Sequence, residues 1–273
     1  MRRCATITRM PRLVVVGVLA LLAVGCGSPD GGSTGTESTR VLVYLLRGDE
    51  VGAAARRAPA TQAVAEAALR ELLRGPTAAE EEAGLGTAIP DGTELLDVAV
   101  EDGVATVDLS AAYDDGGGSA AMLARLAQVV FTATQFPTVD GVRYRIDGEP
   151  VETFSTEGVV LEGLQERSDY EEQSPAILVE RPAVGDVVSS PLRLEGTANT
   201  FEATFQYALL AADGSRLADG FVTASCGTGC RGTFDVDVAF DAAGAESMTL
   251  QVWEPSARDG SRTKEVAVPL GVE

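Results

Sequence analysis

The sequence has 273 residues, enough for two ordinary domains, and its formal net charge at neutral pH is −20. Because like charges repel, so acidic a chain is not expected to bind nucleic acid or anionic lipid headgroups. The absence of histidine excludes Ser-His-Asp and Cys-His nucleophiles and the usual zinc and non-haem iron ligand sets. We therefore expect a non-enzymatic protein with no catalytic residue, no metal site and no cofactor.

Residues 1–25 have the pattern of a lipoprotein signal peptide. A basic start precedes the apolar run Leu13–Val24, which is too short for a comfortable membrane span. The run ends in Leu22-Ala23-Val24-Gly25-Cys26, which resembles a bacterial lipobox, although Ala23 stands where that motif usually has leucine. The pattern predicts that Cys26 is lipidated and becomes the mature N-terminus. An ordinary secretory signal or an uncleaved anchor is the alternative.

Residues 26–39 are rich in glycine, serine and threonine, which predicts a flexible tether. Cleavage before Cys26 would remove four arginines and leave a net charge of −24. The expected location is the outer face of the bacterial cytoplasmic membrane, where the lipid holds the protein.

Residues 40–167 predict an α+β domain with the element order β-α-β-β-α-β. Apolar positions in the first helix form one stripe, and Gly75 with Pro76 ends it. Two helices would cover one face of a small mixed sheet. The expected elements are a strand 41–46, a helix 60–73, a hairpin 96–107 that reverses at Asp102-Gly103, a helix 120–134 capped by Ser119, and a strand 142–146.

Residues 72–110 resemble the GerMN domain of bacterial sporulation and germination proteins. The resemblance implies a surface or spore-envelope protein without established enzymatic activity. It also implies a domain of the ring-building-motif type, with possible self-association. The matching residues are Leu72-Leu73-x-Gly75-Pro76, Gly84-Leu85, Thr87-Ala88-Ile89-Pro90-x-Gly92-Thr93 and Val107-Asp108-Leu109-Ser110.

Residues 168–175 are polar and acidic, which predicts a linker, and residues 176–273 predict an all-β domain. Short alternating runs separated by turns are typical of an immunoglobulin-like β-sandwich. In the third run, Phe201, Phe205 and Leu209 are expected to share one face. The expected strands are 176–180, 192–198, 202–210, 217–224, 232–240, 247–253 and 263–270.

This second half resembles the Gmad2 domain, an immunoglobulin-like module that often follows GerMN in bacterial lipoproteins. The two resemblances occur in the expected order and together cover nearly all of the chain after Cys26. The matching residues are Pro191-Leu192, Gly196-x-Ala198, Phe201-Glu202-Ala203, Gly232-x-Phe234 and Asp259-Gly260-Ser261.

Two features of the second domain are candidates for function. Cys226 and Cys230 are expected to form a structural disulfide, because disulfides persist outside the cytoplasm and the spacing is not that of a redox Cys-x-x-Cys pair. Strand alternation places Trp253 on the face opposite Met248, where an exposed indole could stack on a sugar. A bulge before Pro255 that turns the ring inward is the favoured interpretation, because most aromatic side chains of such sandwiches pack in the core.

In the first domain, Arg143 and Arg145 share one strand face and could bind a carboxylate-bearing partner, but internal ion pairs are the favoured interpretation in so acidic a chain. The acidic runs 80–82 and 114–115 could hold a metal, but they lack the spacing of a calcium loop and favour a solvated surface. Residues 116–119 could bind phosphate on free N–H groups, but the neighbouring aspartates favour a turn and a helix cap.

These features predict a lipid-anchored cell-surface protein that uses two interaction modules to contact envelope proteins or peptidoglycan. The role would be of the sporulation and germination type. Alternatively, the protein would assist a membrane sensor kinase, because twenty arginines beside one lysine suggest a GC-rich, actinomycete-like genome. The sequence is also compatible with a glycan- or solute-binding lipoprotein and, less readily, with a carboxylate-only wall hydrolase.

Overall fold

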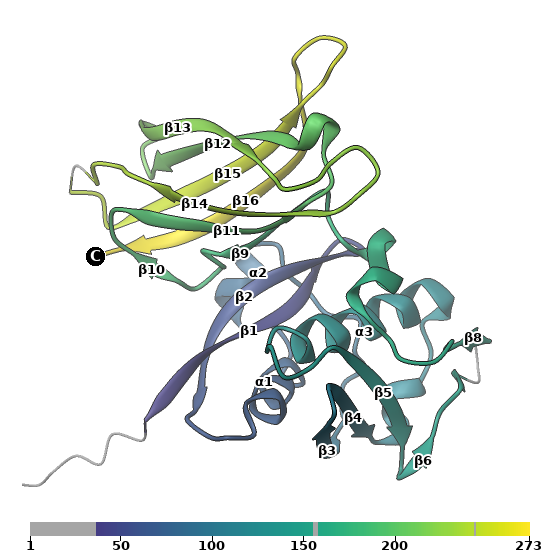
Figure 1. Ribbon diagram of the computed structural model, residues 1–273. Coiled ribbons are helices and arrows are strands. Elements are labelled where there is room, and N and C mark those ends of the chain that lie inside the picture. Colours follow the sequence, from purple (N-terminus) through teal and green to yellow (C-terminus); the bar gives the residue numbers. More distant parts are fainter. Residues whose placement is uncertain (1–36, 155–157, 243) are drawn as a thin grey trace, which may run out of the picture. The chain divides into compact units, whose positions relative to one another are not determined.

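The computed structural model describes residues 37–154, 158–242 and 244–273, all of which belong to one compact unit. Cys26, the signal peptide and all but the last three residues of the tether lie outside the described residues. The first half of the unit is an α+β domain and the second half is mostly β, as predicted (Figure 1).

The chain begins with a hairpin in which β1 (Ser38–Arg47) pairs antiparallel with β2 (Glu50–Pro59). The interior of β1 is the apolar run from Val41 to Leu46, which is fully buried. β2 has no counterpart among the predicted elements, because its sequence EVGAAARRAP contains four alanines and shows no clear alternation of apolar and polar residues.

The helices are shorter or shifted relative to the prediction. Helix α1 covers Val64–Leu72, and a short helix, α2 (Ala78–Glu82), follows it. The third helix, α3 (Gly118–Ala133), begins two residues before the predicted start at residue 120. Its N-cap is Gly117, whose φ of 100° favours glycine, so the prediction that Ser119 caps this helix is wrong.

The predicted hairpin and the strand after α3 form a four-stranded sheet, ordered β3-β4-β5-β6. β3 and β4 are antiparallel, and β4 and β5 are parallel, which makes the sheet mixed as expected. Beyond it, β7 and β8 form a short separate hairpin. The bounds are β3 (Leu95–Glu101), β4 (Val104–Leu109), β5 (Gly141–Ile146), β6 (Glu149–Pro150), β7 (Thr153–Phe154) and β8 (Val159–Val160).

β1 does not join this sheet, because side chains of α3 and of the residues just after it bond the strand's other edge. Gln135 accepts from the Leu42 amide at 2.8 Å and donates to its carbonyl at 2.7 Å. Thr132 accepts from the Tyr44 amide at 3.1 Å, and Gln128 donates to the Tyr44 carbonyl at 3.1 Å. These side chains satisfy backbone groups that would otherwise need a neighbouring strand.

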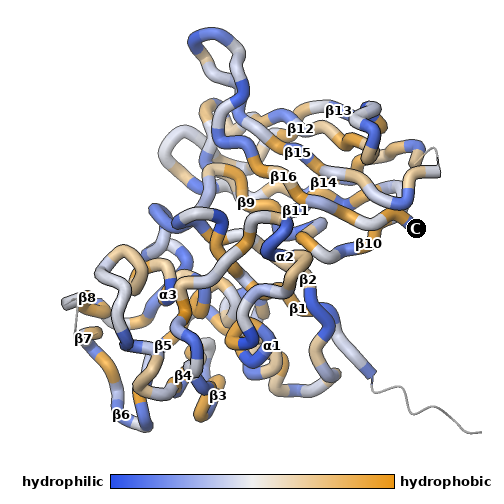
Figure 2. Tube along the Cα trace, turned by 180° about the vertical axis from the view of Figure 1, so that it is seen from behind, coloured by the Kyte–Doolittle hydropathy of each residue, from blue (hydrophilic) through white to orange (hydrophobic). Residues whose placement is uncertain are grey.

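The second half packs two sheets, ordered β14-β11-β9 and β10-β16-β15-β12-β13, and all seven predicted strands are present. The turn between β15 and β16 is mostly hydrophilic and exposed (Figure 2). The bounds are β9 (Ile177–Arg181), β10 (Val187–Val188), β11 (Leu192–Ala198), β12 (Thr204–Ala211), β13 (Arg216–Thr223), β14 (Gly232–Val238), β15 (Ser247–Pro255) and β16 (Arg262–Val272).

Two details of this half differ from the prediction. Phe201 lies in a short 3-10 helix, η3 (Phe201–Ala203), and is exposed, so it does not share the buried face of Phe205 and Leu209. The predicted polar linker is also structured. It forms a second 3-10 helix, η2 (Arg167–Gln173), which buries Tyr170.

Candidate functional site

The GerMN-like motif around Ile89 is a loop held in place by two buried side chains of α3. The Arg125 guanidinium donates to the carbonyls of Ala88, Tyr113 and Gly116 at 2.7, 2.8 and 2.6 Å. Gln128 accepts from the Ala88 amide at 3.0 Å. The side chains of α3 therefore fix the backbone of this loop. The sequence did not indicate Arg125 or Gln128, because both lie within an apolar helical pattern.

The space beside the glycine loop that precedes α3 is filled by the side chain of Arg125. The Arg125 guanidinium bonds the Gly116 carbonyl, and a Cβ atom on Gly117 would lie 2.6 Å from that guanidinium. Because the side chain fills this space, residues 116 and 117 form a bend that leads into α3, in line with the turn favoured from the sequence.

Glu80 corrects the expectation of a solvated acidic surface at residues 80–82. Its carboxylate is buried and forms two hydrogen bonds with Arg56, at 2.9 and 2.5 Å, while Glu81 and Glu82 are exposed. Glu80 also forms a capping box with Thr77 at the start of α2. Burial alone would raise the pKa of Glu80, but the hydrogen bonds from Arg56 and Thr77 lower it below its usual value.

Arg143 and Arg145 lie on the open face of the four-stranded sheet. In β5, Val142 and Tyr144 point into the core, and the two arginines that alternate with them are exposed. Thr106 and Asp108 of β4 are their neighbours in register. Neither arginine forms an ion pair with a described residue, so the expected internal ion pairs are absent from this part of the chain.

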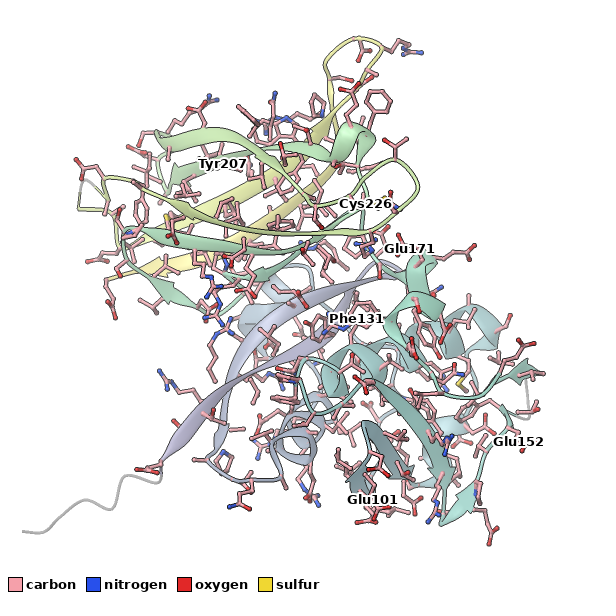
Figure 3. The ribbon with its side chains drawn as sticks, viewed as in Figure 1. Glu101, Phe131, Glu152, Glu171, Tyr207 and Cys226 are labelled. Atoms are coloured by element: carbon pink, nitrogen blue, oxygen red, sulfur yellow. A yellow bond between two sulfur atoms is a disulfide. The ribbon has the colours of Figure 1, made fainter. Side chains whose placement is uncertain are left out.

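A groove of about 500 Å³ contains these two arginines. Residues 150–153 line one part of its wall, and the aliphatic side chains of Val160 and Leu161 line another. Glu152, labelled in Figure 3, is the one acidic residue among the described residues that line it. A surface with two guanidinium groups that have no ion-pair partner among the described residues, beside aliphatic side chains, suits a segment that carries both carboxylates and apolar residues.

Trp253 is not the exposed aromatic that strand alternation predicted. Its side chain is 7% exposed, and the register of β15 and β16 shifts between Val252 and Glu254. The Arg262 guanidinium carbon lies 3.8 Å from the centre of the ring. The bulge favoured from the sequence is therefore present, and Arg262 occupies the surface on which a sugar would stack.

Cys226 and Cys230 are joined by a disulfide, and their loop is bonded to neighbouring segments. The Gly229 amide donates to Asn199 at 3.1 Å, and Asn199 donates to Glu171 at 3.0 Å. Cys226 and Glu171, which are both labelled in Figure 3, lie near each other. The residue after the loop, Arg231, bonds Glu171 at 2.8 and 3.0 Å and thereby lowers the pKa of that carboxyl group.

Replacing Cys226 and Cys230 together by serine is expected to lower the free energy of unfolding by about 2 kcal/mol, the loop-entropy estimate for so short a loop. Urea unfolding of the oxidised protein and of the double variant measures the difference. Reduction of the wild-type protein should give the same loss and should leave the double variant unchanged. A double variant as stable as the oxidised protein would contradict a stabilising disulfide.

A partly buried polar network, which the sequence did not indicate, links β1, η2 and β9. The Tyr44 hydroxyl donates to Glu180, and Arg167 donates to Glu180 at 2.8 Å and to the Tyr44 oxygen at 3.1 Å. Burial raises the pKa of Tyr44, and the charge of Glu180 raises it further. The phenol is therefore a hydrogen-bond donor at neutral pH, and the network has a structural role.

The described residues contain no group of three His, Cys, Asp or Glu side chains arranged to hold a metal ion. No helix among them is long and apolar enough to cross a membrane.

The fold is that of an α+β domain followed by a β-sandwich of the immunoglobulin type. Residues 42–152 match the Germane family, described as "Sporulation and spore germination". Residues 176–261 match the Gmad2 family, described as "Immunoglobulin-like domain of bacterial spore germination". The chain therefore contains a Germane domain followed by a Gmad2 domain, and both of these families are described by sporulation or spore germination.

Solved structures from Bacillus subtilis are similar to parts of this chain. The first GerMN domain of the sporulation protein GerM is 21% identical; the match covers 48% of this chain and 99% of that chain, with a TM-score of 0.41. The tandem GerMN domains of GerM are 16% identical; the match covers 77% of this chain and 64% of that chain, with a TM-score of 0.42. No curated protein matches the chain.

Proposed function

We propose that the protein is a lipid-anchored, non-enzymatic component of the cell envelope. Its Germane domain binds an acidic segment of a neighbouring envelope protein in the groove that contains Arg143 and Arg145. Both matching families are described by sporulation or germination, and neither description names a reaction.

One observation carries this proposal. In a chain with a net charge of −20, two neighbouring arginines on an open sheet face form no ion pair with a described residue. A guanidinium group binds a carboxylate through two parallel hydrogen bonds, which gives orientation as well as attraction. Most of the surface of so acidic a chain would repel an acidic partner, so exposed arginines of this kind determine where it can bind.

The sequence before the described residues supports the membrane anchor. Residues 1–25 have the order of a lipoprotein signal, with Cys26 as the lipidated residue. Because β1 already begins at Ser38, the predicted tether has 12 residues, 26–37, and could extend to at most about 43 Å. This reach would let the two domains contact proteins of the membrane surface and of the inner layer of the wall.

In vivo crosslinking tests the proposal. A photo-reactive amino acid at Thr106, which lines the groove, is expected to crosslink to an envelope protein through a segment rich in Asp and Glu, mapped by mass spectrometry. The double variant R143E/R145E should lose the product, because it reverses both charges. R216E/R258E, with the same charge change at exposed positions of the Gmad2 domain, should keep it.

Two further outcomes are informative. Cys26→Ala should release the protein from the membrane and abolish the crosslink. A product unchanged in R143E/R145E would overturn the proposed role of the arginines, and a crosslink to a second copy of the chain would show self-association of the Germane domain instead. The identity of the captured protein distinguishes a germination-type role from a sensor-kinase accessory role.

A further inference from the structure

A second groove, of about 470 Å³, lies where β1 and β2 meet the segment from β9 to β11. β2 is bonded to this segment directly, since the Ala55 amide donates to the Val184 carbonyl at 2.7 Å. Five arginines line the groove, together with two acidic residues, Asp186 and Glu273. In the whole chain the balance is the opposite, since 41 acidic residues stand against 21 basic ones. The arginines are Arg40, Arg56, Arg57, Arg181 and Arg193.

Three of these arginines are each held by a carboxylate in a two-pronged contact. Arg40 bonds Asp186 at 2.9 and 2.7 Å. Arg193 bonds Asp235 at 2.7 and 2.6 Å, and Arg56 is held by Glu80 as described above. Each contact shows a guanidinium group bound by a carboxylate. Carboxylates are therefore the groups that bind arginines within this region of the protein.

The remaining two arginines are incompletely paired. Arg57 forms no hydrogen bond or ion pair with a described residue. It lies directly opposite Arg40 in the β1–β2 register, a position where two like charges repel. Arg181 contacts Glu195 at 3.4 Å, and Arg193 contacts the same carboxylate oxygen at 3.5 Å. A further anion in the groove would balance this charge.

We propose that this groove binds a ligand with at least two carboxylates, one on Arg57 and one on Arg181. The ligand is either a small polycarboxylate or a peptide with consecutive acidic residues, and both have the chemistry of the internal partners Asp186 and Asp235. The volume lies within the range of about 300–1,000 Å³ typical of small-ligand sites. Glu273 lines the same groove, so its side chain competes with the ligand for the arginines.

This site is separate from the groove of Arg143 and Arg145, so neither proposal depends on the other. Calorimetric titration of the soluble protein from residue 27 onward, at low salt, tests it with two probes, citrate and hexaglutamate. Both are expected to bind, and binding should weaken as the salt concentration rises. Arg57→Gln should weaken binding about tenfold or more, because it removes a charge-assisted contact. Glu273→Gln should strengthen it, because it removes the competing carboxylate.

Arg258→Gln is the matched control, since Arg258 lies outside the groove and its side chain is 90% exposed. Binding to this variant should equal that of the wild type, and thermal unfolding of every variant should confirm that it folds. If hexaglutamate binds much more tightly than citrate, the ligand is an acidic peptide; the reverse order indicates a small polycarboxylate. No binding of either probe, or equal binding to Arg57→Gln and wild type, would overturn the proposal.

Discussion

Replacing Arg56 by methionine is expected to lower the free energy of unfolding by about 3–5 kcal/mol, because it leaves a buried carboxylate without its partner. The side chains of Arg56 and Glu80 are 9% and 6% exposed. Arg56 also donates to the carbonyls of Glu71 and Gly75, and so ties β2 to the end of α1. Urea unfolding, with the slope compared between variants, gives the difference.

The exposed pair of Glu66 and Arg70 on α1 provides the control. Arg70→Met should lower the free energy of unfolding by no more than about 0.5 kcal/mol, since exposed ion pairs four residues apart on a helix contribute little to stability. Equal losses in the two variants would contradict the importance of the buried pair.

The same pair predicts how stability depends on pH. The pKa of Glu80 is lower in the folded protein than its usual value of about 4.3. Its contribution to stability is therefore fully present above the unfolded-state pKa and is lost as the pH falls through the folded-state pKa. Unfolding measured from about pH 6 downward should show this loss in the wild type, and the loss should be smaller in Glu80→Gln.

The second large effect is expected at Arg125. Arg125→Leu should lower the free energy of unfolding by about 3 kcal/mol or more, because three carbonyl groups lose a charged donor. The three carbonyls belong to Ala88 in the motif loop and to Tyr113 and Gly116 just before α3. The variant should therefore lose local structure at these segments as well as global stability. Hydrogen exchange is expected to speed up at residues 87–93 and 113–118.

Arg143→Leu removes an exposed arginine from the same domain and is the matched control. It should change stability by no more than about 0.5 kcal/mol. An Arg125→Leu variant with the stability and hydrogen exchange of this control would contradict the anchoring role of Arg125.

Much of the fold could be predicted from the sequence, because many of its elements carry a local signal. β11 matches the predicted bounds 192–198, and its alternating burial is the pattern that the sequence showed. β2 and α2 were missed. β2 is rich in alanine, and α2 has only five residues, of which Glu80 is held by Arg56, 24 positions away.

The candidate sites were predicted less completely. The alternation in β5 placed Arg143 and Arg145 on one exposed face, and the spacing of Cys226 and Cys230 indicated their disulfide. The same reasoning failed for Trp253, because a bulge and the side chain of Arg262 decide its exposure. The groove of Arg57 and Arg181 gave no signal, since its arginines come from separate strands.

The sequence by itself determined the acidic charge, the order of an α+β domain before a β-sandwich, and the two family matches, because these depend on composition and on local period. The tertiary structure alone decided which charged side chains have a partner of opposite charge. Glu80 found a buried partner, whereas Arg57 and Arg143 found none among the described residues. The reason is physical: pairing depends on distances between side chains of remote segments, and those distances exist only once the chain has packed.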